Sequence, residues 1–215
     1  MNVYFPSKNE PIKLYRNPKS GHCHRVELMM SLLDLPYETV DLDMANGAHK
    51  APEFLEISPF GQVPAIVDNG IKLSDSIGIL TYLEKKYNEG YEWHPKDPVK
   101  AAEVQRWLSV SAGEIAYGPC ILRLVKVFGA DLDYDMAKDK TESLFSVLDL
   151  ILSERNFLAG DEITLADVAG YSNIALVPEG GVSLDPYPSI NAWLARVEAQ
   201  PRFCGMDSSR IRQAS

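Results

Sequence analysis

The order of hydrophobic spacings in the first 87 residues constrains the fold of this chain more than any other feature. Apolar and polar residues alternate over IKLYR, whereas residues 26 to 33 place apolar side chains three or four positions apart, as on one helix face. Asn69-Gly70 separates two further strand-like runs and is a strong hairpin signal. We therefore expect, in order, strand 12–16, a helix through 26–33, strand 37–43, strand 64–68, strand 71–75 and helix 76–87.

This order predicts a four-stranded mixed sheet, because strands joined through a helix run parallel and strands joined by a tight turn run antiparallel. The corresponding fold class is an α/β thioredoxin-like domain over residues 1–88, with residues 1–11 as an N-terminal extension. Residues 89–98 are rich in Gly, Pro and charge, which predicts a linker. Residues 99–215 show only helical spacing and predict an all-α C-terminal helical domain.

The second domain is predicted to contain two long amphipathic helices, one after residue 99 and one around residues 144–152, whose apolar faces pack against each other. Tyr117-Gly118-Pro119 predicts a break in the first of them. Thr164 and Asp167 have the spacing of a capping box before a helix that is apolar on nearly every side. By the usual range for helix caps, loss of Asp167 should cost about 0.5–2 kcal/mol.

The composition argues against several classes of function. A net charge of -9 without a basic cluster disfavours a nucleic-acid partner. No apolar run approaches the ~18–20 residues of a membrane span, and the N-terminus lacks the apolar part of a signal peptide, so we expect no membrane partner and a cytoplasmic protein. Cys23, Cys120 and Cys204 are odd in number and far apart, which indicates reduced thiols. His22 and His24 flank Cys23 but would point in different directions on a helix, so we expect no metal.

Four features occur in a fixed order along the first half of the chain. Ser20 precedes the first helix, the basic pair His49-Lys50 lies in a polar loop, Val63-Pro64 opens an apolar strand, and Asp75-Ser76 begins a helical pattern. Together they resemble the glutathione-binding half of the glutathione transferases. The P-x-S pattern followed by R-V is similar to the serine-using branches, phi-like or theta-like bacterial forms among them.

The resemblance covers nearly the whole chain and implies an enzyme of the EC 2.5.1.18 type. Such an enzyme joins the thiolate of its co-substrate glutathione to small electrophilic molecules, a reaction of detoxification. It also implies a cytoplasmic homodimer, in which Phe60 would be either an anchor between subunits or a side chain packed within its own subunit.

The resemblance also implies how the middle of glutathione would be held. The peptide bond before Pro64 would be cis, and the N–H and C=O of Val63 would pair with the cysteinyl unit as if a strand were added. Gln62, immediately before Val63, could contribute a hydrogen bond from its side-chain amide.

The two ends of glutathione carry carboxylates, for which the resemblance suggests two positions. The start of the helix at Ser76 would bind the γ-glutamyl carboxylate, and Asp75 would accept from the γ-glutamyl amine, although both could equally be an ordinary helix cap. His49 and Lys50 would hold the glycyl carboxylate, although charged residues in loops are usually only solvated.

Activation of the glutathione thiol requires that the thiolate be favoured. Lowering a thiol pKa by about two units takes ~2.7 kcal/mol, which one charge-assisted hydrogen bond and a helix N-terminus can supply. Ser20 is the first candidate for that catalytic donor, against the alternative of a plain helix cap. Cys23 is the second, because a cysteine in the first turn of a helix has a lowered pKa, against the alternative of a packed thiol.

The electrophile would be bound by the early part of the second domain. The candidates combine aromatic, polar and charged residues at helical spacing, and the same pattern is common in a helical core: Trp107, Ser111, Glu114, Tyr117 and Arg123. Two other functions stay open from the sequence. One is a glutathione-dependent disulfide reductase or peroxidase acting through Cys23, and the other is a non-catalytic glutathione-binding protein.

Overall fold

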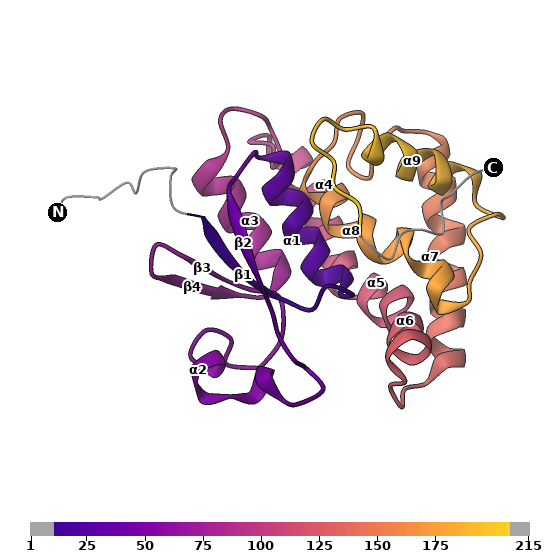
Figure 1. Cartoon of the computed structure of the whole chain (residues 1–215). Helices are drawn as coiled ribbons and strands as arrows, with labels where there is room; N and C mark the ends of the chain where they lie inside the picture. The colour runs from indigo at the N-terminus through magenta and orange to yellow at the C-terminus, as the bar shows by residue number, and fades with distance from the viewer. Residues whose placement is uncertain (1–10, 207–215) are drawn as a thin grey trace. The chain divides into compact units, whose positions relative to one another are not determined.

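The computed structural model describes residues 11–206 (Figure 1). The chain divides into two compact units, the first ending at Asn88 and the second beginning at Glu89. Apart from Pro11, the expected N-terminal extension lies outside the described residues. Among the described residues, the sheet belongs to the first unit and the second unit is helical.

The sheet has the strand order β2-β1-β3-β4. It is formed by β1 (Ile12–Arg16), β2 (Tyr37–Asp41), β3 (Ala65–Asp68) and β4 (Ile71–Ser74). β1 pairs parallel with β2 and antiparallel with β3, and β3 pairs antiparallel with β4. Asn69 and Gly70 turn this hairpin with φ values of 48° and 80°, as a two-residue turn requires. The mixed sheet and the hairpin are therefore confirmed.

Helices cover the sheet of the first unit. α1 (Gly21–Leu32) and α3 (Ser76–Tyr87) pack against each other, and α3 also packs against β3 and β4 (Figure 1). Leu14 is fully buried, while the ring of Tyr15 lies 5.8 Å from that of Phe54 in α2 (Pro52–Leu55). Because successive side chains of a strand point to opposite faces, α2 lies on the side of the sheet that Leu14 does not face.

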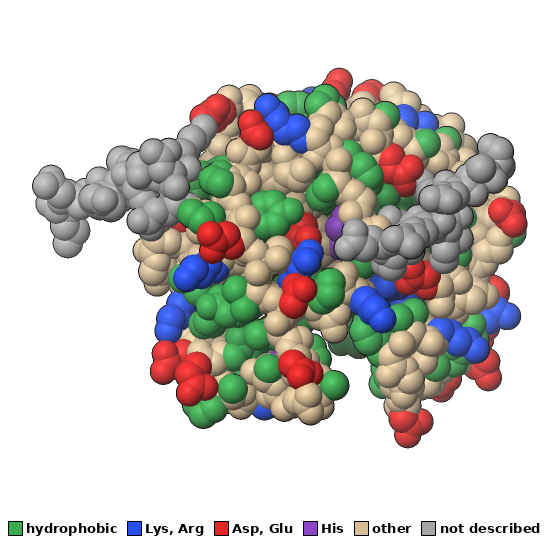
Figure 2. All heavy atoms as spheres, in the orientation of Figure 1, with side chains coloured by type: hydrophobic (Ala, Val, Ile, Leu, Met, Phe, Trp, Pro, Cys, Tyr) green, Lys and Arg blue, Asp and Glu red, His purple; other side chains and the backbone are tan. Residues whose placement is uncertain are grey.

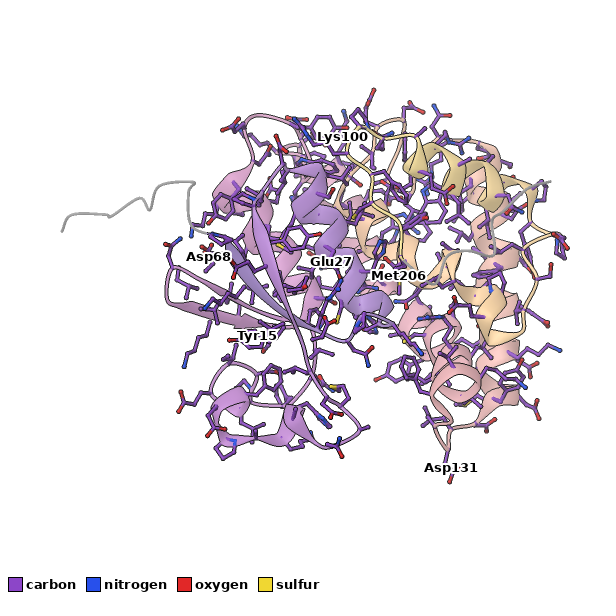
Figure 3. The ribbon with its side chains drawn as sticks, in the orientation of Figure 1. Tyr15, Glu27, Asp68, Lys100, Asp131 and Met206 are labelled. Atoms are coloured by element: carbon purple, nitrogen blue, oxygen red, sulfur yellow. The ribbon has the colours of Figure 1, made fainter. Side chains whose placement is uncertain are left out.

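Asp68, at the end of β3, has a buried carboxylate that gathers three donors on one oxygen. Its Oδ2 accepts from the hydroxyl of Tyr82 at 2.7 Å, the ammonium of Lys86 at 2.8 Å and the hydroxyl of Tyr87 at 2.6 Å. Burial alone would raise the pKa of Asp68, but these hydrogen bonds and the charge of Lys86 lower it. Figure 3 shows Asp68 at the hairpin side of the unit, away from Tyr15 and α2. The cluster therefore ties the hairpin to the last turns of α3.

Replacing Asp68 by asparagine is expected to lower the free energy of unfolding near pH 7 by about 2–4 kcal/mol, since charge-assisted bonds to a buried group are lost. Because the pKa of Asp68 is lower in the folded state, its contribution is complete above the unfolded pKa and is lost as pH falls through the folded pKa. Urea unfolding at a series of acid pH values should show a steeper loss for the wild type than for Asp68→Asn.

A surface carboxylate of the same unit provides the control for Asp68. Glu56 accepts from Lys72 at 3.0 Å, and both side chains are exposed, so Glu56→Gln should hardly change the unfolding curve. If the free energy of unfolding falls equally steeply with decreasing pH in the wild type and in Asp68→Asn, the role given to the cluster is contradicted.

The second unit is a succession of helices along the chain (Figure 1). They are α4 (Pro98–Ala112), α5 (Glu114–Tyr117), α6 (Pro119–Phe128), α7 (Tyr134–Ser153), α8 (Leu165–Ala175), η2 (Val177–Gly180) and α9 (Pro188–Glu198). The break predicted at Gly118 is confirmed, and a second break, at Gly113, was not predicted. A Cβ on Gly118 would lie 2.9 Å from Oγ1 of Thr141, so glycine permits the close approach of α7.

The two long amphipathic helices do not find their main partners in each other. α4 packs chiefly against α8, and α7 packs against α9 and α6, so the prediction that α4 and α7 bury one another is wrong. The physical reason is the composition of α8, which is buried from Leu165 to Ile174. A helix that is apolar all round offers α4 a larger apolar surface than an amphipathic helix does.

The stretch Pro98–Phe128 is long and apolar enough, by length and composition alone, to cross a membrane. The prediction that no apolar run approaches that length is therefore too strict. The stretch is interrupted at Gly113 and Gly118, and its helices pack against α7 and α8. Packing within a helical core accounts for its apolar character.

Charged side chains of both signs are mixed over the face drawn in Figure 2. The net charge of -9 is therefore not gathered into one acidic patch on that face. Exposed ion pairs such as Lys138 with Glu142 contribute little to stability, because water and salt screen them. The buried polar clusters matter more for the fold.

Asp167 is the buried polar centre of the second unit. The predicted capping box with Thr164 is present, with Oδ2 of Asp167 accepting from the Thr164 N–H at 2.8 Å. Its Oδ1 also accepts from the N–H of Leu158 at 2.8 Å and from Nε1 of Trp193 at 2.9 Å. Burial raises the pKa of Asp167, and these donors oppose that effect. One side chain thus joins three segments, which is more than a helix cap does.

Candidate functional site

Ser20 is the N-cap of α1, which begins at Gly21. Its backbone is extended, with φ −87° and ψ 121°, and its Oγ accepts from the N–H of Cys23 at 3.3 Å. A donor to Oγ polarises the hydroxyl and holds the oxygen in place, while the hydroxyl proton can still be donated to another acceptor. The helix N-terminus adds partial positive charge at the same point. Ser20 therefore combines the two features that stabilise a thiolate.

Cys23 does not have the lowered pKa that its place in the first turn predicted. The side chain is fully buried, and burial raises the pKa of the thiol to about 11, with hydrogen bonds involving Ser20 and the backbone of Asn17 offsetting only part of the effect. The predicted lowering of this pKa is wrong, because desolvation outweighs the helix terminus, and a catalytic role of Cys23 stays a prediction. At neutral pH this thiol is protonated and packed.

Val63 has the open backbone that the resemblance implied. The Val63-Pro64 peptide bond is cis, as predicted. Since β3 begins only at Ala65, neither the N–H nor the C=O of Val63 has a hydrogen-bonding partner within residues 11–206. The neighbouring Gln62 is held on both sides by buried Ser58, whose hydroxyl donates to its C=O at 2.8 Å and accepts from its N–H at 3.1 Å. The backbone at Val63 is thus ready to pair with an extended peptide.

Asp75 and Ser76 begin α3, and each has a partner within the unit. The carboxylate of Asp75 accepts from the N–H of Gly78 at 2.8 Å, so Asp75 is an N-cap. Its φ of 72° is uncommon for a residue other than glycine, and such strain occurs often at ligand-binding positions. Ser76 is 6% exposed, and its hydroxyl accepts from Nη1 of buried Arg25 at 3.2 Å.

His49 and Lys50 lie in the short helix η1 (Ala48–Lys50) beside the loop that contains Phe60. Nζ of Lys50 donates to the C=O of Phe60 at 3.2 Å, which leaves the other ammonium hydrogens for a carboxylate. Nδ1 of His49 is buried and has no partner among the described residues. Gly61 has φ 61°, and a Cβ on it would lie 2.6 Å from the His49 C=O, so the loop packs tightly on η1.

The strand register brings three of these positions to one end of the sheet. Ala65 pairs with Tyr15 at the end of β1 and with Ser74 at the end of β4. The chain leads from Tyr15 to Ser20, enters Ala65 from Val63, and continues from Ser74 into α3. The thiol-stabilising candidate, the open backbone and the helix N-terminus therefore lie around one corner of the first unit.

Two of the five electrophile candidates are fully engaged within the helical unit. Trp107 is 3% exposed, and its Nε1 donates to Glu103 at 3.3 Å. The guanidinium of Arg123, also 3% exposed, donates to Glu179 at 2.7 Å and 3.0 Å. Buried side chains with these partners stabilise the helical core, so the geometry does not support them as contacts for an electrophile.

The other three electrophile candidates differ in exposure. Ser111 is fully buried, and its hydroxyl has no partner among the described residues. Glu114 accepts from Nζ of Lys140 at 2.7 Å, and Tyr117 is 63% exposed. Among the candidates, Tyr117 has the ring most accessible to another molecule, and its role remains a prediction.

Ser58 and Arg25 hydrogen-bond to the candidate residues Gln62 and Ser76, although the sequence did not single out a role for either. Ser58 precedes a proline in a loop, which is a weak signal because many loop serines are only solvated. Arg25 lies four positions before Met29, on the face predicted to be buried, and a charge on such a face was the available signal.

Two families match the chain. The family described as glutathione S-transferase, N-terminal domain, matches residues 10–85, and the one described as glutathione S-transferase, C-terminal domain, matches residues 120–201. Glutathione S-transferase 3 of Zea mays is 34% identical over 208 residues, which cover 90% of this chain and 91% of that protein. Glutathione S-transferase APIC of Nicotiana tabacum is 32% identical over 204 residues, which cover 89% of this chain and 95% of that protein.

Solved structures resemble the whole chain as well. A glutathione S-transferase from Pseudomonas fluorescens superposes with a TM-score of 0.86 at 27% identity, covering 92% of this chain and all of its own. A glutathione transferase homolog from Drosophila mojavensis, solved with bound glutathione, has a TM-score of 0.82 at 25% identity and covers 93% of this chain and 92% of its own. The likeness therefore extends over both units.

Proposed function

The chain belongs to the glutathione transferase family, and from that premise we propose which of its residues bind glutathione and activate its thiol. The enzyme is a glutathione transferase with glutathione as its substrate. The observation that carries the assignment of residues is the open backbone of Val63, because it offers a donor and an acceptor to the cysteinyl unit of the tripeptide.

Glutathione would lie along the corner of the first unit where Ser20, Val63 and Ser76 meet. The N-terminus of α3 and the hydroxyl of Ser76 would bind the γ-glutamyl carboxylate, and Asp75 would accept from the γ-glutamyl amine. At the other end of the tripeptide, Lys50 would bind the glycyl carboxylate, with His49 and the amide of Gln62 beside it. Support comes from the register, which gathers Ser20, Val63 and Ser76, and from the hydrogen bond of Lys50 to the Phe60 C=O, which places Lys50 beside the loop that leads to Gln62.

The hydroxyl of Ser20 would donate to the sulfur of glutathione. The thiol proton leaves to solvent when the thiolate forms, and the thiolate then attacks an electrophilic carbon of the second substrate. A carbon–sulfur bond forms, and a leaving group such as chloride departs with its electron pair. Stabilisation by one polarised hydroxyl and the N-terminus of α1 supports this role, and no proton needs to leave Ser20.

Two measurements test this function. Titration of glutathione followed by calorimetry should give saturable heat, and absence of heat at millimolar concentration would contradict the glutathione site. Conjugation of glutathione to 1-chloro-2,4-dinitrobenzene should release chloride and the thioether. A protein that reduces a glutathione mixed disulfide but does not conjugate would favour the redox function instead, and one that binds glutathione with an unshifted thiol pKa would favour a non-catalytic role.

We place the enzyme in the cytoplasm, where its conjugation reaction would serve detoxification. None of its three cysteines is in a disulfide, which agrees with a reducing compartment. Fractionation of the cells that express it, with detection by antibody, tests the compartment, and recovery outside the cytoplasmic fraction would contradict it.

We also propose a homodimer with Phe60 as an anchor between subunits. The side chain is 80% exposed, so the alternative of packing within its own subunit is wrong, and Lys50 and Gly61 fix the loop behind it. Phe60→Ser is expected to shift sedimentation toward the monomer, because the anchor's apolar burial is lost. Val99, 76% exposed, provides a control in Val99→Ser. A wild-type monomer, or equal effects of both substitutions, would contradict the proposal.

A further inference from the structure

Arg25 is a fully buried cation that no step of the proposed reaction uses. It lies in α1, the helix that Ser20 caps, and is 1% exposed. Its Nη1 donates to Oγ of Ser76 at 3.2 Å, across 51 positions of sequence. One guanidinium thus joins the helix of the thiol-stabilising candidate to the helix whose N-terminus would bind a carboxylate.

We propose that Arg25 is a positioning residue that sets how strongly the N-terminus of α3 binds the γ-glutamyl carboxylate of glutathione. The inference rests on the proposed function, because it concerns the same glutathione site. It adds a residue that does not itself touch glutathione but acts through Ser76 and through its own charge.

The hydrogen bond to Arg25 orients the hydroxyl of Ser76. Since the guanidinium can only donate, it occupies a lone pair of Oγ, and the hydroxyl hydrogen must point elsewhere. A charged donor also polarises the hydroxyl, which makes Ser76 a stronger donor to an anion. Loss of Arg25 would leave this hydroxyl free to rotate.

The first turn of α3 has donors available for that anion. The carboxylate of Asp75 accepts a hydrogen bond from the N–H of Gly78, and the N–H of Ile79 donates to the Asp75 C=O. The N–H groups of Ser76 and Ile77, at the first two helical positions, have no acceptor within the helix. A carboxylate that accepts from them would lie just beyond the Ser76 hydroxyl.

The charge of Arg25 strengthens the attraction at this point. A guanidinium stays protonated at any pH at which the protein is folded, and burial protects its field from screening by salt. Its charge adds to the partial positive charge of the helix N-terminus. The guanidinium and the helix N-terminus both favour a carboxylate over a neutral group. Arg25 should therefore affect binding of the γ-glutamyl carboxylate and not of the rest of glutathione.

The test compares two ligands on three proteins: the wild type, Arg25→Met and Arg25→Lys. The ligands are glutathione and γ-aminobutyryl-cysteinyl-glycine, which lacks only the carboxylate in question. We expect Arg25→Met to raise the Kd of glutathione about 10-fold or more, and to leave the Kd of the analogue within about 2-fold. Arg25→Lys keeps the charge and should restore part of the preference for glutathione.

Kinetics separates positioning from a structural role. In Arg25→Met the KM for glutathione should rise, while kcat at saturating glutathione stays within about 3-fold, because Ser20 is untouched. The proposal would be overturned if Arg25→Met lost affinity for both ligands equally, or if its kcat fell while its KM stayed unchanged. Should Arg25→Met fail to fold by circular dichroism, Arg25→Gln replaces it, since glutamine keeps a donor but loses the charge. A wild-type ratio of the two Kd values in Arg25→Gln would then overturn the proposal.

The proposed glutathione site can fail separately. If the wild type binds glutathione and the analogue equally well, the carboxylate is not held at α3, and both the site assignment and the role of Arg25 fall. If the wild type prefers glutathione and Arg25→Met keeps that preference, the site stands and only the role of Arg25 is overturned.

Discussion

Replacing Ser20 by alanine is expected to lower kcat/KM for conjugation near neutral pH by about 10- to 100-fold. The hydroxyl that would donate to the glutathione sulfur is lost, while the N-terminus of α1 remains, so the pKa of the bound thiol should rise by about one to two units, or ~1.4–2.7 kcal/mol. Difference absorbance of the thiolate in the ultraviolet, measured against pH on the glutathione complex, reports that pKa directly. The conjugation rate against pH should shift in parallel.

Cys23→Ala and Ser20→Thr are the matched variants. Cys23→Ala removes the buried thiol but keeps the backbone N–H that donates to Ser20, so conjugation should be nearly unchanged. Ser20→Thr keeps a hydroxyl and a helix cap, and should recover part of the rate. Loss of conjugation in Cys23→Ala together with retention in Ser20→Ala would reverse the roles and favour the redox function.

Replacing Asp167 by alanine is expected to lower the free energy of unfolding of the helical unit by about 3–5 kcal/mol. This exceeds the range predicted for a helix cap, because the buried carboxylate also accepts from Leu158 and Trp193. Their buried N–H groups would lose their partner in the variant. Chemical unfolding followed by the fluorescence of tryptophan would measure the change, and expression at reduced temperature would help recover the variant.

Asp133→Ala is the control for Asp167. Asp133 caps α7 and is exposed, and its carboxylate accepts from the N–H of Met136 at 2.9 Å. It should cost about 1 kcal/mol, the value typical of an exposed cap. Equal losses for Asp133→Ala and Asp167→Ala would show that the contacts with Leu158 and Trp193 contribute nothing beyond the cap.

Local patterns predicted most of the secondary structure because their causes are local. The Asn69-Gly70 turn, the capping box at Thr164 and the break at Gly118 depend on the conformations open to a few neighbouring residues. The partner of α4 was predicted wrongly for the opposite reason. Helical spacing tells which face of α4 is apolar, but not whether α7 or α8 covers it.

The candidate glutathione site was predicted as residue types rather than as contacts. Ser20, Val63-Pro64 and Asp75-Ser76 were found from their order along the chain and from the resemblance, and the register of β3 is what gathers them at one corner. The buried thiol of Cys23 shows the limit of this reasoning. Its position in the helix predicted a lowered pKa, and burial reversed the direction.

The sequence by itself determined most of the elements, their order and the family, because propensity, turn chemistry and spacing are properties of neighbouring residues. Tertiary structure alone decided which polar groups meet when they are far apart in the chain, as Arg25 and Ser76 do. It also decided how much water each group loses, as at Cys23 and Asp167. Burial and long-range contact set pKa and hydrogen bonding, and neither follows from local sequence.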